Sequence, residues 1–151
     1  MVDNQKNIEL VVFGKTTDKF SEQVPSQVHI LNYVSNNETL VNLYNAADVF
    51  VHPSLDENLP NTIMEALACG LPVVAFQTGG IPEMITHKEN GYLVPPENES
   101  ELAKGIEYMI DNDNDTIQNL RINARNKVET NYDPQIIAKQ YEKLYSSILE
   151  K

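Results

Sequence analysis

The chain has 151 residues, a hydrophobic content of 41% and a formal net charge of −11 at neutral pH. The length and the hydrophobic content predict one globular domain with a sizeable core rather than a disordered chain. The acidic charge argues against nucleic acids and anionic membranes as general partners. The single cysteine, Cys69, excludes an internal disulfide and is typical of a reducing cytoplasm, where we expect the protein to reside.

Short apolar runs alternate with helical patterns over the first two thirds of the chain. The apolar runs predict buried strands at residues 8–13, 28–31, 48–52, 73–76 and 92–94. Helices are predicted at residues 20–24, 38–47 and 61–69, with Asn36 or Asn37 as the cap of the second and Pro82 in the first turn of a further short helix. This alternation implies a Rossmann-like α/β domain, a parallel sheet with helices on both faces.

The last third of the chain is predicted to be a helical cover. Helices are expected at residues 100–110 and 116–130 and from Pro134 onward, with a polar break at residues 111–115. In the last helix, apolar residues recur every three or four positions and are expected to face the core: Ile137, Tyr141, Leu144 and Ile148. The sequence has no internal repeat and no low-complexity linker, so residues 1–151 are assigned to a single domain.

The stretch from residue 48 to residue 80 carries the candidate chemistry. It reads as strand, loop, short helix, strand and glycine turn, with Glu57 in the loop and Glu65 on the helix. A helix N-terminus at the end of a strand is where α/β sheets hold anions. Ionised carboxylates accept hydrogen bonds from the hydroxyls of a sugar and a ribose. We therefore expect a nucleotide-sugar site in this stretch.

The same region lacks basic residues. From Phe20 to His87 there is no Lys or Arg. A bound diphosphate would depend on backbone N–H groups and the helix dipole, or on cations from elsewhere in the fold or from chain that is not present. Lys15 is the cation adjacent to the expected site. Its side chain either contacts a phosphate group or is solvated, and the sequence leaves both alternatives open.

One motif gives the chain a family resemblance. Glu57-Asn-Leu-Pro-Asn-Thr-Ile-Met-Glu65 is a Glu-x7-Glu motif, framed by Pro53-Ser54, by Gly70-Leu-Pro72 and by Gly79-Gly80-Ile-Pro82-Glu83. From about Ile8 onward the chain resembles the C-terminal, donor-binding domain of glycosyltransferase family 4. The resemblance implies a GT-B enzyme, in which two Rossmann-like domains face each other across a cleft. It also implies a hexosyltransferase-like reaction, in which a sugar is transferred from a nucleotide diphosphate sugar to an acceptor hydroxyl with retention of the anomeric configuration. The implied setting is polysaccharide or glycolipid synthesis.

The resemblance also implies roles for individual residues. Glu57 would accept hydrogen bonds from hydroxyls of the donor sugar at the catalytic centre, and Glu65 would bind the ribose hydroxyls. The segment facing the sugar and the diphosphate comprises Glu57, Asn58, Leu59, Pro60, Asn61 and Thr62. The ribose and the base would meet Glu65, Tyr33, Val34 and Gly14. The family is metal-independent, so no metal ion and no other cofactor is expected.

The chain departs from the family pattern in composition and extent. Asn32 stands where the family has a small residue, so the exact shape of the base pocket is not carried over. Asn58-Leu59 stand where Gly-Phe is commoner, so sugar specificity is not carried over either. The family's diphosphate-binding Arg and Lys, the first strand and helix of the domain, and the acceptor-binding N-terminal domain all precede the segment that opens here at Ile8. We therefore expect a fragment of a longer enzyme or a degenerate relative, inactive alone. Its missing N-terminal domain is an expected partner, and the full-length enzyme is expected in the cytoplasm, with peripheral membrane association left open.

Structural alternatives remain for several of these residues. Thr62 and Glu65 form a Thr-x-x-Glu pattern typical of a capping box, in which Glu65 would bind the backbone N–H of Thr62. Glu57 in isolation would be an ordinary loop carboxylate, and His52 ends a strand near the expected cleft. For the whole chain, the rival hypotheses are another GT-B enzyme such as a nucleotide-sugar epimerase, and a non-catalytic Rossmann-like interaction domain.

Overall fold

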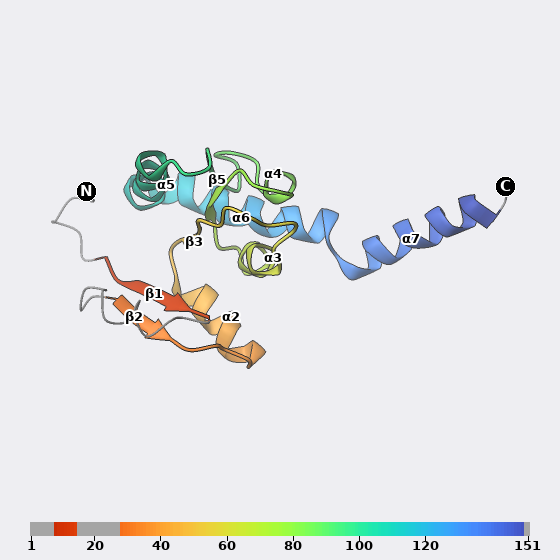
Figure 1. The fold of residues 1–151 in the computed structure, drawn as a ribbon, viewed down its shortest axis with the longest axis horizontal. Helices are drawn as coiled ribbons and strands as arrows, with labels where there is room; N and C mark the ends of the chain where they lie inside the picture. Colours follow the sequence, from red (N-terminus) through yellow and green to blue (C-terminus); the bar gives the residue numbers. More distant parts are fainter. Residues whose placement is uncertain (1–7, 15–27, 150–151) are drawn as a thin grey trace. The chain divides into compact units, whose positions relative to one another are not determined.

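The structure is a computed structural model that describes residues 8–14 and 28–149. The chain divides into two compact units, Met1–Leu43 and Tyr44–Lys151, and each is described by itself. Figure 1 gives the order of the helices and strands along the chain. The helix expected at residues 20–24 and the side chain of Lys15 lie outside the described residues.

The first unit contains a parallel pair of strands. Strand β1 (Leu10–Phe13) pairs with β2 (Val28–Leu31) along its full length. The second strand has the predicted bounds, and the first begins two residues later than predicted. Helix α2 (Asn37–Ala46) follows, and its last residues, from Tyr44 on, are counted with the second unit. The backbone N–H of Thr39 donates to the side-chain oxygen of Asn36 at 3.0 Å. That bond confirms Asn36 as the cap.

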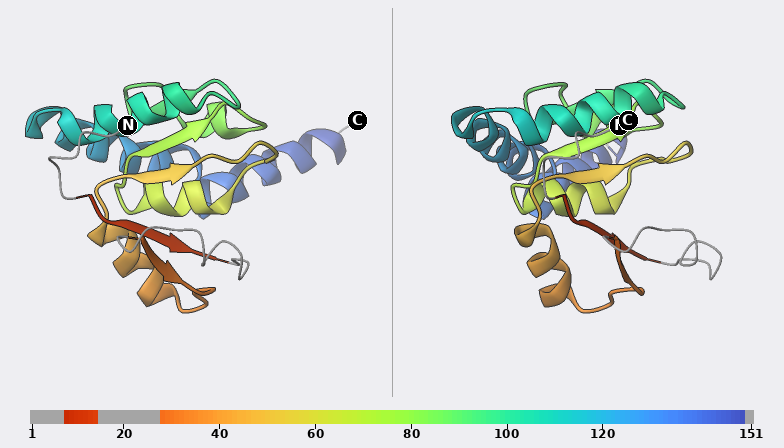
Figure 2. Two further views of the ribbon diagram at one scale, coloured as in Figure 1. Left: turned by 60° about the vertical axis from the view of Figure 1, so that its left-hand side comes forward. Right: turned by 90° about the vertical axis from the view of Figure 1, so that its left-hand side faces the viewer.

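The second unit is built around a three-stranded parallel sheet. Its strands are β3 (Phe50–His52), β4 (Val73–Phe76) and β5 (Gly91–Val94), with β4 in the centre. Its helices are α3 (Asn61–Ala68), α4 (Ile81–Met84), α5 (Glu99–Asp111), α6 (Asn114–Asn131) and α7 (Pro134–Leu149). Figure 2 shows α3 on one face of this sheet and α5 on the other. The predicted α/β class, with parallel strands and helices on both faces, is confirmed.

The core of the second unit centres on β4. All four residues of Val73–Phe76 are buried, as expected for a strand whose sequence is apolar on both faces. A buried cluster on one side of it comprises Val74, Phe76, Val94, Met109 and Leu120, from two strands and from α5 and α6. Full burial of each such side chain contributes roughly 1.5–3 kcal/mol, so this cluster fixes the strand from which the neighbouring loops emerge.

The polar break before α6 is shorter than predicted. Helix α5 continues to Asp111 and α6 begins at Asn114. Asp113 supplies the reason, because its carboxylate accepts hydrogen bonds from the backbone N–H and the hydroxyl of Thr116, each at 2.9 Å. These bonds lower the pKa of the Asp113 carboxyl, and the residue acts as an N-cap rather than as part of a loop.

The prediction that the apolar stripe of α7 faces the core is wrong. Helix α7 has no buried residue, and Tyr141, Leu144 and Ile148 are 54%, 51% and 60% exposed. Figure 1 shows α7 extending beyond the end of α6, away from the three-stranded sheet. Ile137 and Leu144 are among the residues of α7 that line a groove of about 630 Å³ together with Leu59. Helical periodicity predicted an apolar face correctly, but not what covers it.

Candidate functional site

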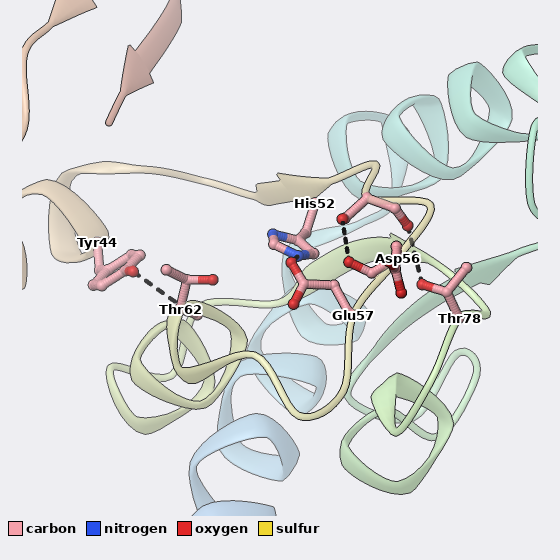
Figure 3. A network of polar contacts seen from close by, with 7 residues as sticks. Tyr44, His52, Asp56, Glu57, Thr62 and Thr78 are labelled. Atoms are coloured by element: carbon pink, nitrogen blue, oxygen red, sulfur yellow. Dashed lines mark hydrogen bonds and ion pairs between the residues drawn. The ribbon is translucent and has the colours of Figure 1, made fainter. Parts of the chain in front are cut away.

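The loop at residues 54–60 leaves the end of β3 and is tied to the chain that follows β4. The hydroxyl of Ser54 donates to the carbonyl oxygen of Asp56 at 3.3 Å. The hydroxyl of Thr78 donates to the carbonyl oxygen of Ser54 at 3.0 Å (Figure 3). These bonds hold the loop against the segment after the central strand, at the carboxyl edge of the sheet where α/β domains place ligand sites.

Two glycines let the segment after β4 approach this loop closely. Gly79 has a φ of +51°, and a Cβ atom there would lie 1.7 Å from the carbonyl oxygen of Glu57. The backbone N–H of Gly80 donates to the carbonyl oxygen of Asn58 at 2.6 Å. Neither contact tolerates a side chain on the glycine. The sequence identified this pair as a turn, whereas the structure shows that it also fixes the backbone of Glu57 and Asn58.

The carboxylate of Glu57 contacts the imidazole of His52. The distance from Nε2 of His52 to Oε1 of Glu57 is 3.0 Å, and the two side chains are 16% and 28% exposed. Figure 3 shows the ring, at the end of β3, lying beside the carboxylate of the loop. Since a carboxylate offers about four lone-pair sites, this contact leaves Glu57 able to accept further hydrogen bonds.

The carboxylate of Glu65 is also held by one aromatic side chain. The hydroxyl of Tyr44 lies 3.2 Å from Oε2 of Glu65 and 3.3 Å from the carbonyl oxygen of Thr62. Tyr44 is buried. Burial raises its pKa well above the usual range, and the neighbouring charge of Glu65 and their hydrogen bond raise it further. The hydroxyl therefore stays protonated and donates, while Glu65 itself lies on the exposed face of α3.

The capping-box alternative for Glu65 is wrong. Helix α3 begins at Asn61, with Pro60 at the N-cap and no side chain of the described residues capping it. Thr62 therefore lies inside the first turn, where a capping box cannot use it as the cap. The backbone N–H groups of Asn61 and Thr62 belong to the helix end whose donors have no intrahelical acceptor. N–H donors of this kind are the groups that bind anions at helix N-termini, and they lie next to the loop that carries Glu57.

The arginines of α6 lie at the other end of α3. Arg125 donates from Nη1 to the carbonyl oxygen of Ala68, the last residue of α3. Arg121 donates from Nη2 to the carbonyl oxygen of Ala47 at 3.1 Å. Cations at helix C-termini complement the helix dipole. These two arginines thus have a structural role away from the N-terminus of α3.

The remaining predicted site residues belong to the first unit. Gly14 follows β1 with a φ of +118°, a conformation that favours glycine. Tyr33 is 71% exposed, and Val34 is partly buried. The joint use of these residues with Glu57 and Glu65 in one nucleotide site stays a prediction.

The comparison with known proteins decides the family. The sequence profile of the family described as "Glycosyl transferases group 1" matches residues 1–127. The chain belongs to this family. The group 1 match and the solved relatives confirm the part of the resemblance that identified a C-terminal domain of GT-B glycosyltransferases.

Several known proteins are similar to this chain over most of its length. An uncharacterized glycosyltransferase of Methanocaldococcus jannaschii is 35% identical over 127 residues, which cover 84% of this chain and 32% of that protein. The capsular polysaccharide biosynthesis glycosyltransferase CapM of Staphylococcus aureus is 28% identical, with coverage of 100% and 41%. The structure of Anabaena Alr3699/HepE in complex with UDP-glucose superimposes with a TM-score of 0.80 at 27% identity, covering 92% of this chain and 41% of that one. The chain thus spans less than half the length of each of these three proteins.

The described residues contain neither a metal-binding cluster nor a membrane-spanning helix. Among residues 8–14 and 28–149, no group of three or more His, Cys, Asp and Glu side chains is arranged to hold a metal ion. No helix in the described part of this group 1 chain is long and apolar enough to cross a membrane. The expectation of a metal-independent reaction stays a prediction.

Sequence reasoning missed the partners of the two carboxylates. It noted His52 for its place at a strand end, but not for the contact with Glu57 five residues later. It placed Tyr44 within the helix predicted at residues 38–47 and did not consider its hydroxyl. The available signal was the polar atom that each of these two side chains carries, because a polar atom needs a hydrogen-bonding partner when it is buried.

Proposed function

We propose that this chain binds the nucleotide-sugar donor of a glycosyltransferase of family 4. The observation that carries the proposal is the fixed placement of Glu57 and Glu65 around the N-terminus of α3. Each carboxylate is held by one neighbouring side chain and keeps lone pairs for a ligand. Helix α3 presents N–H donors that have no intrahelical acceptor, and these lie between the two glutamates in sequence.

In this proposal the two carboxylates recognise the two hydroxyl-bearing parts of the donor. Glu65 lies exposed on α3 and accepts hydrogen bonds from the ribose hydroxyls. Glu57 accepts hydrogen bonds from the sugar hydroxyls and fixes the orientation of the sugar at the reacting carbon. Gly14, Tyr33 and Val34 contribute to the ribose and base side, as the family resemblance implies.

The diphosphate is placed at the N-terminus of α3. Backbone N–H groups from Asn58 to Thr62 and the positive helix end stabilise the charge that develops on the leaving diphosphate. The dipole contributes roughly 0.3–2 kcal/mol, too little to replace cations. The cations therefore come from outside the segment between Phe20 and His87, which has no Lys or Arg.

The complete reaction is proposed to be retaining transfer of a sugar, of the hexose class, to an acceptor hydroxyl. We assign no nucleophile, because Glu57 is given a positioning role and a double displacement needs a carboxylate at the anomeric carbon. The name of CapM supports polysaccharide synthesis as the setting, with glycolipid synthesis as the related option. The reaction needs no metal ion, and the enzyme works in the cytoplasm or at the membrane surface.

Transfer requires a second wall of the cleft. In a GT-B enzyme this wall is the acceptor-binding domain, and we propose that the 151 residues bind the donor sugar nucleotide without turning it over. Two relatives support the assignment of donor binding and acceptor binding to separate domains, since this chain covers 32% and 41% of their lengths. Turnover of donor and acceptor by the isolated chain would overturn this part of the proposal.

The experiment is a titration of the chain with UDP-, GDP- and ADP-glucose, followed by NMR. We expect saturable shifts with at least one ligand, and a loss of affinity in Glu65→Gln. Glu89→Gln is the matched control, because Glu89 is an exposed glutamate whose backbone makes its hydrogen bonds with Asn123 and Thr86. Absence of saturable binding for all three ligands, or equal affinity in both variants, refutes the proposal.

A further inference from the structure

We propose that His52 is a positioning residue that holds the carboxylate of Glu57 in place for the donor sugar. The inference rests on the proposed function, because it assigns a cause to the orientation of Glu57. It starts from the 3.0 Å contact between Nε2 of His52 and Oε1 of Glu57. Nothing in the family resemblance gives a role to His52.

The chemistry of the pair fixes which atom donates. An ionised carboxylate only accepts hydrogen bonds, so Nε2 of His52 carries the proton in this contact. Both side chains are mostly shielded from water, at 16% and 28% exposure, and a hydrogen bond to a charged acceptor is stronger there than in water. The bond therefore occupies one oxygen of Glu57 and restricts the rotation of its side chain.

His52 is suited to this task because its own position is rigid. It is the last residue of β3 and pairs in parallel register with Ala75 of the buried central strand. Its ring also lies against the ring of Phe50, with the centroids 5.9 Å apart. Glu57, by contrast, stands in a loop, and the close approach of Gly79 fixes its backbone but does not orient its side chain. A strand residue thus orients the side chain of a loop residue.

The proposed effect is specific to one part of the ligand. Glu57 is assigned to the sugar, whereas the diphosphate and the ribose are assigned to α3 and Glu65. Loss of the His52 contact is therefore expected to weaken binding of a nucleotide sugar and to leave binding of the nucleoside diphosphate unchanged. The expected loss is about two- to tenfold, the cost of ordering one otherwise free side chain. A purely structural role would weaken both ligands.

A ligand-free measurement tests the contact itself. Long-range proton–nitrogen NMR spectra of the imidazole distinguish the two neutral tautomers and the imidazolium. We expect Nε2 of His52 to carry a proton, and its nitrogen shift to change in Glu57→Gln. A proton on Nδ1 alone, with Nε2 bare, overturns the proposal.

The functional test uses two substitutions of His52 in two backgrounds. His52→Gln keeps an N–H donor near the position of Nε2, whereas His52→Leu removes the donor at similar size. Each is made in the wild-type chain and in Glu57→Gln. Calorimetric titrations use UDP-, GDP- and ADP-glucose and the three corresponding nucleoside diphosphates.

We expect His52→Leu to lose affinity for the glucose conjugates alone, His52→Gln to retain most of it, and His52→Leu to add no further loss in Glu57→Gln. Equal losses for both kinds of ligand, or additive losses with Glu57→Gln, overturn the positioning role. If Glu57→Gln weakens glucose conjugates and His52→Leu does not, the inference fails and the proposed function stands. If Glu57→Gln has no effect, or if none of the six ligands binds, the proposed function itself fails.

Discussion

Substitution of Gly79 by alanine tests whether the glycine pair shapes the candidate site. A Cβ atom at Gly79 would lie 1.7 Å from the carbonyl oxygen of Glu57, a distance at which the loop backbone must move. The φ of +51° adds a left-handed conformation that costs an alanine roughly 1–2 kcal/mol. Overpacking costs typically about 1–3 kcal/mol more. We expect the free energy of unfolding to fall by about 2–5 kcal/mol in Gly79→Ala.

Gly70→Ala is the matched control for the conformational part of this cost. Gly70 has a φ of +69°, but the nearest atom to a Cβ there is the carbonyl oxygen of Arg121 at 3.4 Å. This variant is expected to lose only the roughly 1–2 kcal/mol of the left-handed conformation. The difference between the two variants isolates the collision with the loop of Glu57.

Urea unfolding and donor titration measure the two consequences. Gly79→Ala is expected to be at least about 1 kcal/mol less stable than Gly70→Ala, since it carries the overpacking term as well. Because the loop must shift to relieve the collision, Gly79→Ala is also expected to lose affinity for the nucleotide sugar, and Gly70→Ala is not. Equal stability and equal affinity of the two variants would refute the reasoning.

Other predictions concern single contacts. Tyr44→Phe removes the hydrogen bond to Glu65, and it is expected to cost about 1.5–3 kcal/mol of unfolding free energy and to weaken nucleotide binding. A variant that matches wild type in urea melts and in nucleotide titrations would contradict this. Asn98→Ala removes the N-cap of α5 and should cost about 1 kcal/mol in the same melts, whereas an unchanged midpoint would argue against the cap. Ile148→Asp on the exposed side of α7 is expected to stay within about 0.5 kcal/mol of wild type, whereas Leu67→Ala in the core should lose roughly 2–5 kcal/mol. Similar losses for the last two would restore the core-facing assignment of α7.

The strands and helices could be predicted well because their signals are local. Strand 28–31 and strand 73–76 have the predicted bounds, since short apolar runs between turn residues have few alternatives. The start of α7 at Pro134 is also as predicted, because proline favours the first turn of a helix. The break before α6 was placed too widely, because Asp113 could be read as loop or as cap until its bonds to Thr116 were known.

The site was only half predictable, because its supporting contacts are not local. The Glu-x7-Glu pattern and its frame predicted a glycosyltransferase domain, which the group 1 match confirms. The roles of Glu57 and Glu65 stay predictions. The bond from Tyr44 to Glu65 joins residues 21 positions apart, and no periodicity indicates it. The same holds for the approach of Gly79 to the carbonyl group of Glu57. The capping-box alternative failed for a local reason, since the chain enters α3 at Pro60, two residues earlier than that motif requires.

The central claim is that Glu65 binds the ribose of a nucleotide. The most direct test removes the ribose hydroxyls from the ligand and the carboxylate of Glu65 from the protein, separately and together. UDP, GDP and ADP and their 2′,3′-dideoxy forms are titrated into the wild-type chain and into Glu65→Gln. Hydrogen bonds to a charged group contribute about 1.5–3 kcal/mol, so the best-binding ribonucleotide is expected to lose tenfold or more on removal of its hydroxyls in the wild type, and much less in Glu65→Gln. The same loss in both proteins, or none in the wild type, would contradict the claim.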